Sequence, residues 1–148
     1  MNAPFEIDAN SGTLRFTGLQ LVLESNQSLE EFLATEAATR AEQGRENGGW
    51  QPYNFWRQPL GDGRVLGVSV YFFQGRLSKV IFGYLSEDES DWSKWSKERE
   101  LARADTYRQE LSRQLGRLGR FPWGFVGAGY DEKSAGARLF VRYEPSGS

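Results

Sequence analysis

The sequence predicts an α+β fold: a single domain in which an antiparallel sheet of five or more strands packs against one long and one shorter helix. Strand-like segments come in consecutive groups, and helical periodicity is confined to two stretches. The length of 148 residues is typical of one domain, and a hydrophobic content of 39% is enough for a buried core. We expect residues 1–143 to form this domain and residues 144–148 to form a flexible tail.

Strands are predicted where β-branched and aromatic residues lie between turn residues such as Gly, Asn and Asp. The segments with this character are 5–8, 13–16, 19–23, 53–58, 65–73, 76–85, 122–130 and 137–143. From Val80 onward both faces of one strand are apolar. We therefore expect that strand to be central in the sheet and covered on both sides.

Two helices are predicted. Ser28 and Glu31 form a capping box, and the apolar residues that follow recur at helical spacing, which predicts a helix over 29–42. A longer helix is predicted over 95–115, with alternative N-caps at Ser90, Ser93 and Ser96. Its apolar stripe consists of Leu101, Ala104, Tyr107, Leu111, Leu115 and Leu118. The core is expected to include Leu101, Ala104, Leu111, Leu115, Phe82 and Val141.

The absence of Cys and His excludes several classes of chemistry. Disulfides, thiolate nucleophiles, iron–sulfur clusters, zinc fingers and His-based acid/base catalysis each need one of these residues. Among the remaining groups, the carboxylates Glu98, Glu100 and Asp131 are catalytic candidates by exclusion only. Because no spacing singles out a pair, we expect a non-enzyme with no catalytic residues, no cofactor and no metal.

Charge and hydropathy point to a cytoplasmic protein. The net charge of −2 does not indicate nucleic-acid binding. Residues 1–12 lack the basic and apolar regions of a signal peptide. The longest strongly apolar run, 65–73, is much shorter than the roughly 20 residues that cross a bilayer. We therefore expect neither a membrane nor a nucleic acid as partner.

Four acids lie within five residues, at Glu87, Asp88, Glu89 and Asp91. Their spacing does not match an EF-hand loop. Three interpretations stay open: a docking patch, a hard-cation site, and a solvated loop before a helix N-terminus. Clustered acids repel one another and add little stability by themselves, whereas opposite charge on a partner speeds association. The docking interpretation therefore predicts a protein partner with a basic surface.

Aromatic residues are concentrated in 50–56, and Trp92 directly follows the acidic cluster. These side chains form a large aromatic core, exposed anchors at a protein interface, or a platform for a sugar. Acids and aromatics together define the candidate partner-binding residues Glu87, Asp88, Glu89, Asp91, Trp92, Trp50, Tyr53 and Trp56.

Several short motifs resemble a pattern found in small bacterial proteins of the toxin-immunity type. The motifs are 28–33 (SLEEFL), 92–101 (WSKWSKEREL), Leu115-Gly116, Pro122-Trp123-Gly124, 130–134 (YDEKS) and Val141-Arg142-Tyr143. The resemblance implies a cytosolic inhibitor that binds a toxin, and it brings no catalytic residues. The alternative from the residues alone is a small-ligand or carbohydrate-binding domain, with or without weak carboxylate-based hydrolysis.

Overall fold

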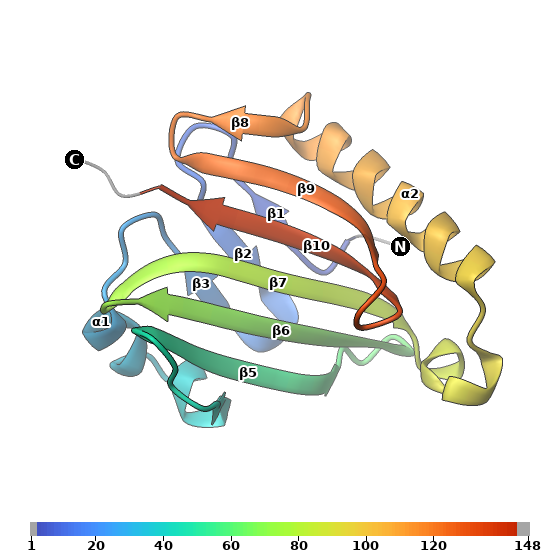
Figure 1. Ribbon diagram of the computed structural model, residues 1–148, viewed down its shortest axis with the longest axis horizontal. Coiled ribbons are helices and arrows are strands. Elements are labelled where there is room, and N and C mark those ends of the chain that lie inside the picture. The colour runs from blue at the N-terminus through green and yellow to red at the C-terminus, as the bar shows by residue number, and fades with distance from the viewer. Residues whose placement is uncertain (1–2, 145–148) are drawn as a thin grey trace.

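A seven-stranded antiparallel sheet forms the frame of the molecule, and a three-stranded sheet lies behind it (Figure 1). The computed structural model describes residues 3–144 and has the predicted α+β class. The large sheet has the order β4-β5-β6-β7-β10-β9-β8, with strands β4 Glu42–Gln43, β5 Trp50–Pro59, β6 Arg64–Phe73, β7 Arg76–Ser86, β8 Gly119–Phe121, β9 Gly124–Asp131 and β10 Gly136–Tyr143. The small sheet has the order β1-β2-β3, with strands β1 Glu6–Ile7, β2 Leu14–Phe16 and β3 Leu21–Leu23.

Two groups of strands joined by short turns build most of the large sheet. The first group is β5, β6 and β7, and the second is β9 and β10. The two groups meet where β7 pairs with β10, with Val80 opposite Val141. Each predicted strand segment is present in the structure. The edge strands β4 and β8 are not predicted, because two or three residues are too few to show an alternating pattern.

One face of the large sheet carries the covering layer. The three-stranded sheet, helix α1 (Leu29–Leu33) and helix α2 (Lys97–Leu115) all pack on this face and share one core with it. Phe5 and Phe16 set their rings nearly perpendicular to the Phe82 ring, with centroids 5.0 and 4.9 Å away. Phe32 of α1 packs against Phe72 at 5.1 Å.

The prediction that the central strand is covered on both sides is wrong. Val80 and Phe82 of β7 are buried beneath the covering layer, whereas Lys79 and Ile81 point to the other face and are only half-buried. In the described part of the chain, no helix or strand lies over that second face. The apolar residue Ile81 on this face is only half-buried, and sequence alternation alone does not reveal which face of a strand is covered.

Helix α1 begins as predicted but ends early. Ser28 Oγ accepts the Glu31 N–H at 3.0 Å, and Glu31 Oε1 accepts the Ser28 N–H at 3.0 Å, which completes the capping box. The predicted helix over 29–42 is wrong beyond Leu33. The Thr35 hydroxyl donates to the Phe32 carbonyl oxygen at 2.6 Å, and this side-chain bond competes with helix continuation. A 3-10 turn follows before the chain enters β4.

Helix α2 begins at Lys97, and Ser96 is its N-cap, with Oγ accepting the Arg99 N–H at 3.1 Å. The predicted core stripe is confirmed for Ala104, Tyr107, Leu111 and Leu115. The prediction is wrong for Leu101, which is 45% exposed. At this level of the helix the ion pair of Glu100 and Arg103 takes the inward position, each side chain being 13% exposed. The remaining predicted core residues, Phe82 and Val141, are buried.

Tyr107 joins α2 to the sheet where β7 and β10 diverge. Its hydroxyl donates to the Tyr84 carbonyl oxygen at 2.5 Å and accepts the Tyr84 N–H at 2.9 Å. The pairing of β7 with β10 ends two residues earlier, at Phe82 and Leu139. One hydroxyl thus satisfies both backbone groups of a strand residue that has lost its neighbour on that side. Burial raises the pKa of Tyr84 to about 12.

Among the described helices, none is both long and apolar enough to cross a membrane. The C-terminal tail predicted for 144–148 falls mainly outside the described residues. Glu144 itself is held in place, because its N–H donates to the Trp123 carbonyl oxygen at 3.0 Å and its carboxylate pairs with Arg120.

We expect Leu111→Ala to lower the free energy of unfolding by about 2–5 kcal/mol, because it removes a fully buried side chain. Leu101→Ala on the same helix is the matched control, and its exposed side chain predicts a change within about 0.5 kcal/mol. Urea denaturation of both variants measures the difference. Equal losses in the two variants would contradict the orientation of α2.

Candidate protein-binding site

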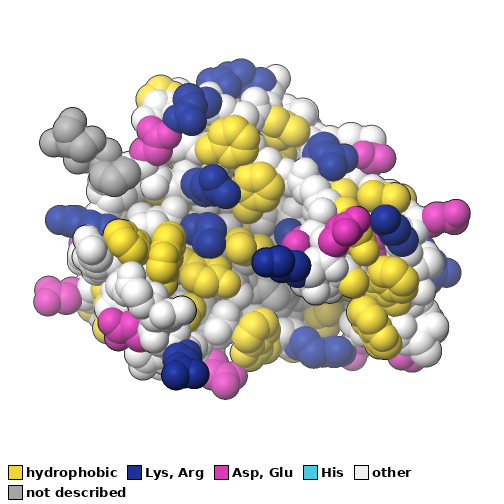
Figure 2. Space-filling view, in the orientation of Figure 1, with side chains coloured by type: hydrophobic (Ala, Val, Ile, Leu, Met, Phe, Trp, Pro, Cys, Tyr) yellow, Lys and Arg dark blue, Asp and Glu magenta, His cyan; other side chains and the backbone are white. Residues whose placement is uncertain are grey.

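The uncovered face of the large sheet, which we call the open face, is basic and aromatic (Figure 2). The described strands β5 to β10 contain a single acidic residue, Asp131. Strand register places the cations Lys79, Arg138 and Arg142 on the open face, together with the rings of Trp50, Tyr71, Phe125 and Phe140. In the space-filling view, basic and hydrophobic side chains gather over the middle strands, and most acidic side chains lie toward the margin.

Two cations of the open face oppose each other without a counter-charge. Lys79 of β7 lies directly across from Arg142 of β10. The Lys79 ammonium lies 4.6 Å from the Tyr71 ring centroid and 5.1 Å from the Trp50 ring centroid, a cation–π arrangement. Within residues 3–144, neither cation has a carboxylate at ion-pair distance. Like charges directly opposite each other destabilise a sheet, so this pair has a cost that no carboxylate of residues 3–144 offsets.

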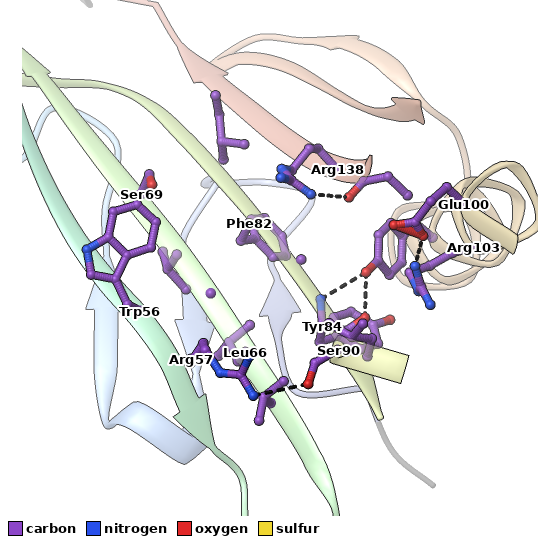
Figure 3. Close-up of a pocket in the computed structure, with 18 residues that line it drawn as sticks. Trp56, Arg57, Leu66, Ser69, Phe82, Tyr84, Ser90, Glu100, Arg103 and Arg138 are labelled. Carbon is purple, nitrogen blue, oxygen red and sulfur yellow. Dashed lines mark hydrogen bonds and ion pairs between the residues drawn. The ribbon is translucent and has the colours of Figure 1, made fainter. Parts of the chain in front are cut away.

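A hollow of about 250 Å³ lies at one end of the open face (Figure 3). Its floor includes Gly67 of β6 and Gly83 of β7, which lie opposite each other in the register. A Cβ atom on Gly67 would come near only the Phe55 carbonyl oxygen, at 4.0 Å. The depression therefore exists because these paired strand residues lack side chains. Glycine in a strand interior weakens the strand, so the hollow also has a cost in stability.

A β-bulge in β5 forms one side of the hollow. The register shifts between Phe55 and Gln58, so that Trp56 and Arg57 together face the single residue Gly67. Arg57 has a φ of +44°, a conformation that non-glycine residues rarely adopt. The bulge leaves Trp56 57% exposed beside the hollow (Figure 3). Backbone strain is thus combined with an exposed indole ring at the same place.

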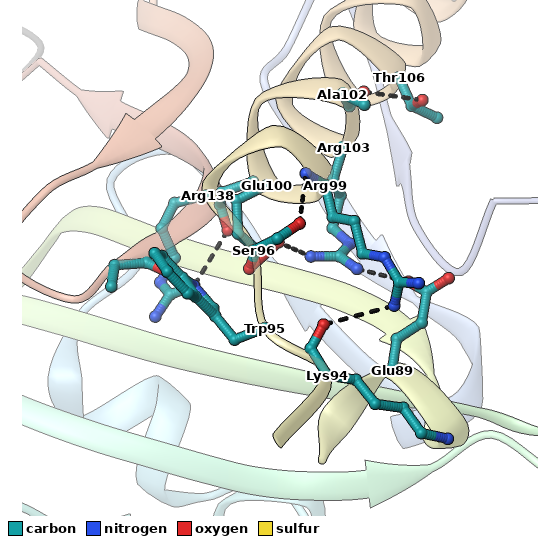
Figure 4. Close-up of polar contacts among 12 residues, drawn as sticks. Glu89, Lys94, Trp95, Ser96, Arg99, Glu100, Ala102, Arg103, Thr106 and Arg138 are labelled. Atoms are coloured by element: carbon teal, nitrogen blue, oxygen red, sulfur yellow. Dashed lines mark hydrogen bonds and ion pairs between the residues drawn. The ribbon is translucent and has the colours of Figure 1, made fainter. Parts of the chain in front are cut away.

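An ion network forms the opposite side. Arg103 of α2 pairs with Glu100 of the same helix and with Glu89 of the acidic segment, residues 87–91 (Figure 4). Glu100, Arg103 and Arg138 all line the hollow. Arg57 donates to Ser90 Oγ at 3.0 Å, which links the bulge to the acidic segment. The acidic segment is therefore held at the end of the open face from two directions.

The four predicted acids are all exposed, but they differ in their contacts. Glu89 pairs with Arg103. The Ser93 backbone N–H donates to Asp91 Oδ1 at 3.0 Å, which holds the pKa of Asp91 below its ordinary value. The side chains of Glu87 and Asp88 make no hydrogen bond or ion pair with the described residues. Two of the acids thus have structural partners, and two face solvent.

The predicted aromatic residues separate into surface and core. Trp92 is 70% exposed and stacks on Trp95 with ring centroids 5.6 Å apart. Trp95 also donates its indole N–H to the Ala135 carbonyl oxygen at 2.6 Å. Trp50 lies on the open face near Lys79, as described above. Tyr53 instead points into the core against Phe32, with 7% of its surface exposed, and therefore leaves the set of candidate contact residues.

The structure also adds residues that the sequence interpretation misses: Lys79, Arg142, Phe125, Phe140, Gly67 and Gly83. A usable signal is present in β10, where Arg138, Phe140 and Arg142 alternate with apolar residues and no acid balances the two cations. The near absence of acids from all strands of the large sheet strengthens that signal. The glycine pair gives no such signal, because strand pairing is needed to bring Gly67 next to Gly83.

The carboxylates considered as catalytic candidates have other contacts. Glu100 is engaged with Arg103, and Glu98 lies on the exposed side of α2. Asp131 accepts the Ser134 hydroxyl at 2.8 Å, and this bond lowers the pKa of Asp131, which is unfavourable for a general acid. Within residues 3–144, no three acidic side chains form a group that could hold a metal ion.

No protein-family model and no curated protein matches the sequence of this chain. Among solved structures, the chain is similar to a chain in the complex described as Rhs1-CT with its cognate immunity protein RhsI1. The TM-score is 0.62 at 15% sequence identity, and the match covers 95% of this chain and 87% of that chain. A likeness at this identity shows the fold alone. At that level it confirms the resemblance to the toxin-immunity type.

We expect the free energy of unfolding to be nearly constant from about pH 5 to 8, because the chain has no His. Hydrogen bonds lower the pKa values of Asp8, Glu31, Asp62, Asp91, Glu110 and Asp131. Their contribution to the free energy of unfolding is complete above about pH 5 and is lost as the pH falls through the folded-state values. Burial raises the pKa of Tyr84, so its contribution is lost as the pH rises above about 10.

Urea titrations over this pH range measure the profile. A change of several kcal/mol between pH 5 and 8 would contradict it and would indicate a buried carboxyl group with a raised pKa.

Proposed function

We propose that this chain is a cytoplasmic, non-catalytic protein-binding module that acts as an immunity-type inhibitor of a bacterial toxin. The observation that carries the proposal is the shared fold over 95% of the chain with a chain of an immunity-protein complex. Exposed tryptophans at both ends of the open face supply the kind of anchor that dominates protein interfaces. The resemblance of six short motifs to proteins of the toxin-immunity type points to the same function.

Within this function, the acidic segment supplies electrostatic steering toward a basic surface of the toxin, and Trp92 supplies an adjoining apolar contact. Glu87 and Asp88 are the acids best placed for this, because neither is engaged by a cation of the described chain. Long-range attraction of this kind raises the association rate more than it raises the final affinity.

The small-ligand alternative has weaker support. The hollow over Gly67 and Gly83, at about 250 Å³, is below the usual range of about 300–1,000 Å³ for small-molecule sites. A second hollow of about 510 Å³ lies between β7 and α2 and is more open to solvent. Two of the arginines around it, Arg64 and Arg103, already pair with Asp62 and Glu89. These two arginines thus form ion pairs within the chain, which makes them less available to bind a ligand.

The direct test is co-expression with the product of the gene next to this chain's own gene, which the proposal predicts to encode a toxin domain. We expect the two proteins to co-purify as a complex and the chain to restore growth of cells that express the toxin. An isolated chain that neither binds that domain nor protects the cells would refute the proposed function.

We expect Glu87→Gln/Asp88→Asn to slow association with the toxin domain several-fold at low salt and to flatten the salt dependence of the rate, because attraction between opposite charges is screened by salt. Stopped-flow or biolayer interferometry measures the rate. Glu24→Gln/Glu36→Gln removes two exposed acids elsewhere and is the matched control. An unchanged rate in the first variant would mean that the acidic segment is only solvated.

A further inference from the structure

We propose that the open face receives an acidic segment of the partner protein, with Lys79 and Arg142 binding its carboxylates and the Gly67–Gly83 hollow receiving one of its apolar side chains. This inference rests on the proposed function and specifies the chemistry of the partner surface. This role of the open face differs from the role proposed for residues 87–91 of this chain, which are expected to face basic groups of the partner. The partner surface is therefore expected to carry both signs of charge.

The two cations at the centre of the open face lack a counter-charge within residues 3–144. Lys79 and Arg142 lie opposite each other on adjacent central strands, and neither has a carboxylate within ion-pair distance in the described chain. Two like charges held together without a counter-ion are unfavourable in the free protein. An anionic group placed between them would remove that repulsion and form two charge-assisted hydrogen bonds.

The two cations lie on a surface rich in aromatic rings. The rings of Trp50 and Tyr71 hold the Lys79 ammonium by cation–π contacts. Phe140 and Phe125 stack in parallel on β10 and β9, with centroids 6.0 Å apart. Rigid aromatic side chains lose little conformational entropy on binding. The cations therefore lie within a pre-formed apolar surface, where ion pairs with a partner are well shielded from water.

The hollow over Gly67 and Gly83 lies on the same open face. It lies four residues along β7 from Lys79, a distance of about 13 Å. Its volume of about 250 Å³ suits one large side chain rather than a whole small molecule. Trp56, presented by the strained bulge, borders it and offers an apolar wall to the entering group. An acidic residue and an apolar residue about 13 Å apart on the partner would engage both parts of the open face.

A protein segment fits these features better than a nucleic acid does. The open face has few cations. The acidic segment, residues 87–91, lies at one end of this face and would repel the phosphate backbone of a nucleic acid that extended past it. The net charge of the chain is −2. A protein segment needs only local carboxylates, which the Lys79–Arg142 pair can accommodate.

Two substitutions test the proposal without harming the fold. Arg142→Glu places an acid opposite Lys79, so the denaturation midpoint is expected to stay unchanged or rise. Gly67→Val fills the hollow where an added Cβ meets nothing closer than 4.0 Å, and the midpoint is again expected to stay or rise. If the denaturation midpoint is unchanged or higher, a loss of binding in these variants cannot be explained by unfolding.

Calorimetry measures the effect, with the toxin domain that the proposed function predicts in the neighbouring gene as the titrant. We expect Arg142→Glu and Gly67→Val each to weaken binding roughly 10-fold or more. Arg15→Glu is the matched control, because Arg15 is exposed on β2 on the opposite side of the molecule. The affinity of this variant for the toxin domain is expected to match that of the wild type.

The outcomes separate this inference from the proposed function. A wild-type chain that does not bind the toxin domain overturns the proposed function. A wild-type chain that binds, with Arg142→Glu and Gly67→Val binding equally well, overturns this inference alone. A single-stranded oligothymidine that binds the wild type and not Arg142→Glu, while toxin affinity is unaffected, also overturns it and assigns the open face to nucleic acid.

Discussion

The placement of every described covering element on one face of the seven-stranded sheet is the constraint on which the rest of the structure depends. Once Val141 faces Val80 beneath the three-stranded sheet, period-two alternation sends Arg142 and Lys79 to the other side. The core is therefore complete with only half of the sheet surface buried. The other half carries no helix or strand of residues 3–144.

Helix α2 forms one side of the hollow over Gly67 and Gly83. The Tyr107 hydroxyl replaces a neighbouring strand at Tyr84, and the ion pair of Glu100 with Arg103 takes the inward position on the first turns of the helix. The helix end thus borders the sheet without covering Gly67 and Gly83. Polar groups that complete the fold also form one side of the hollow, so packing and the candidate site share the same residues.

A nearly neutral net charge conceals a strong separation of charge in this protein. The strands of the large sheet are almost free of acids, while the acidic segment at their end carries four. Binding surfaces that combine both signs select a partner by pattern rather than by total charge. The function proposed above would require this kind of selectivity, because an inhibitor must recognise one toxin among many basic or acidic proteins.

The sequence by itself determined every strand except the short edge strands β4 and β8, and it determined the capping box at Ser28. It also determined the Ser96 cap as one of three alternatives and most of the core stripe on α2. These features depend on local periodicity and local hydrogen bonds. Only the tertiary structure decided which sheet face is covered, why Leu101 is exposed, and why Tyr53 is buried while Trp56 is not. It also brought Lys79 to Arg142 and Gly67 to Gly83. The members of each pair are separated along the chain, and the exposure of Trp56 depends on the bulge in β5. Their positions are set by strand register, which no local sequence pattern encodes.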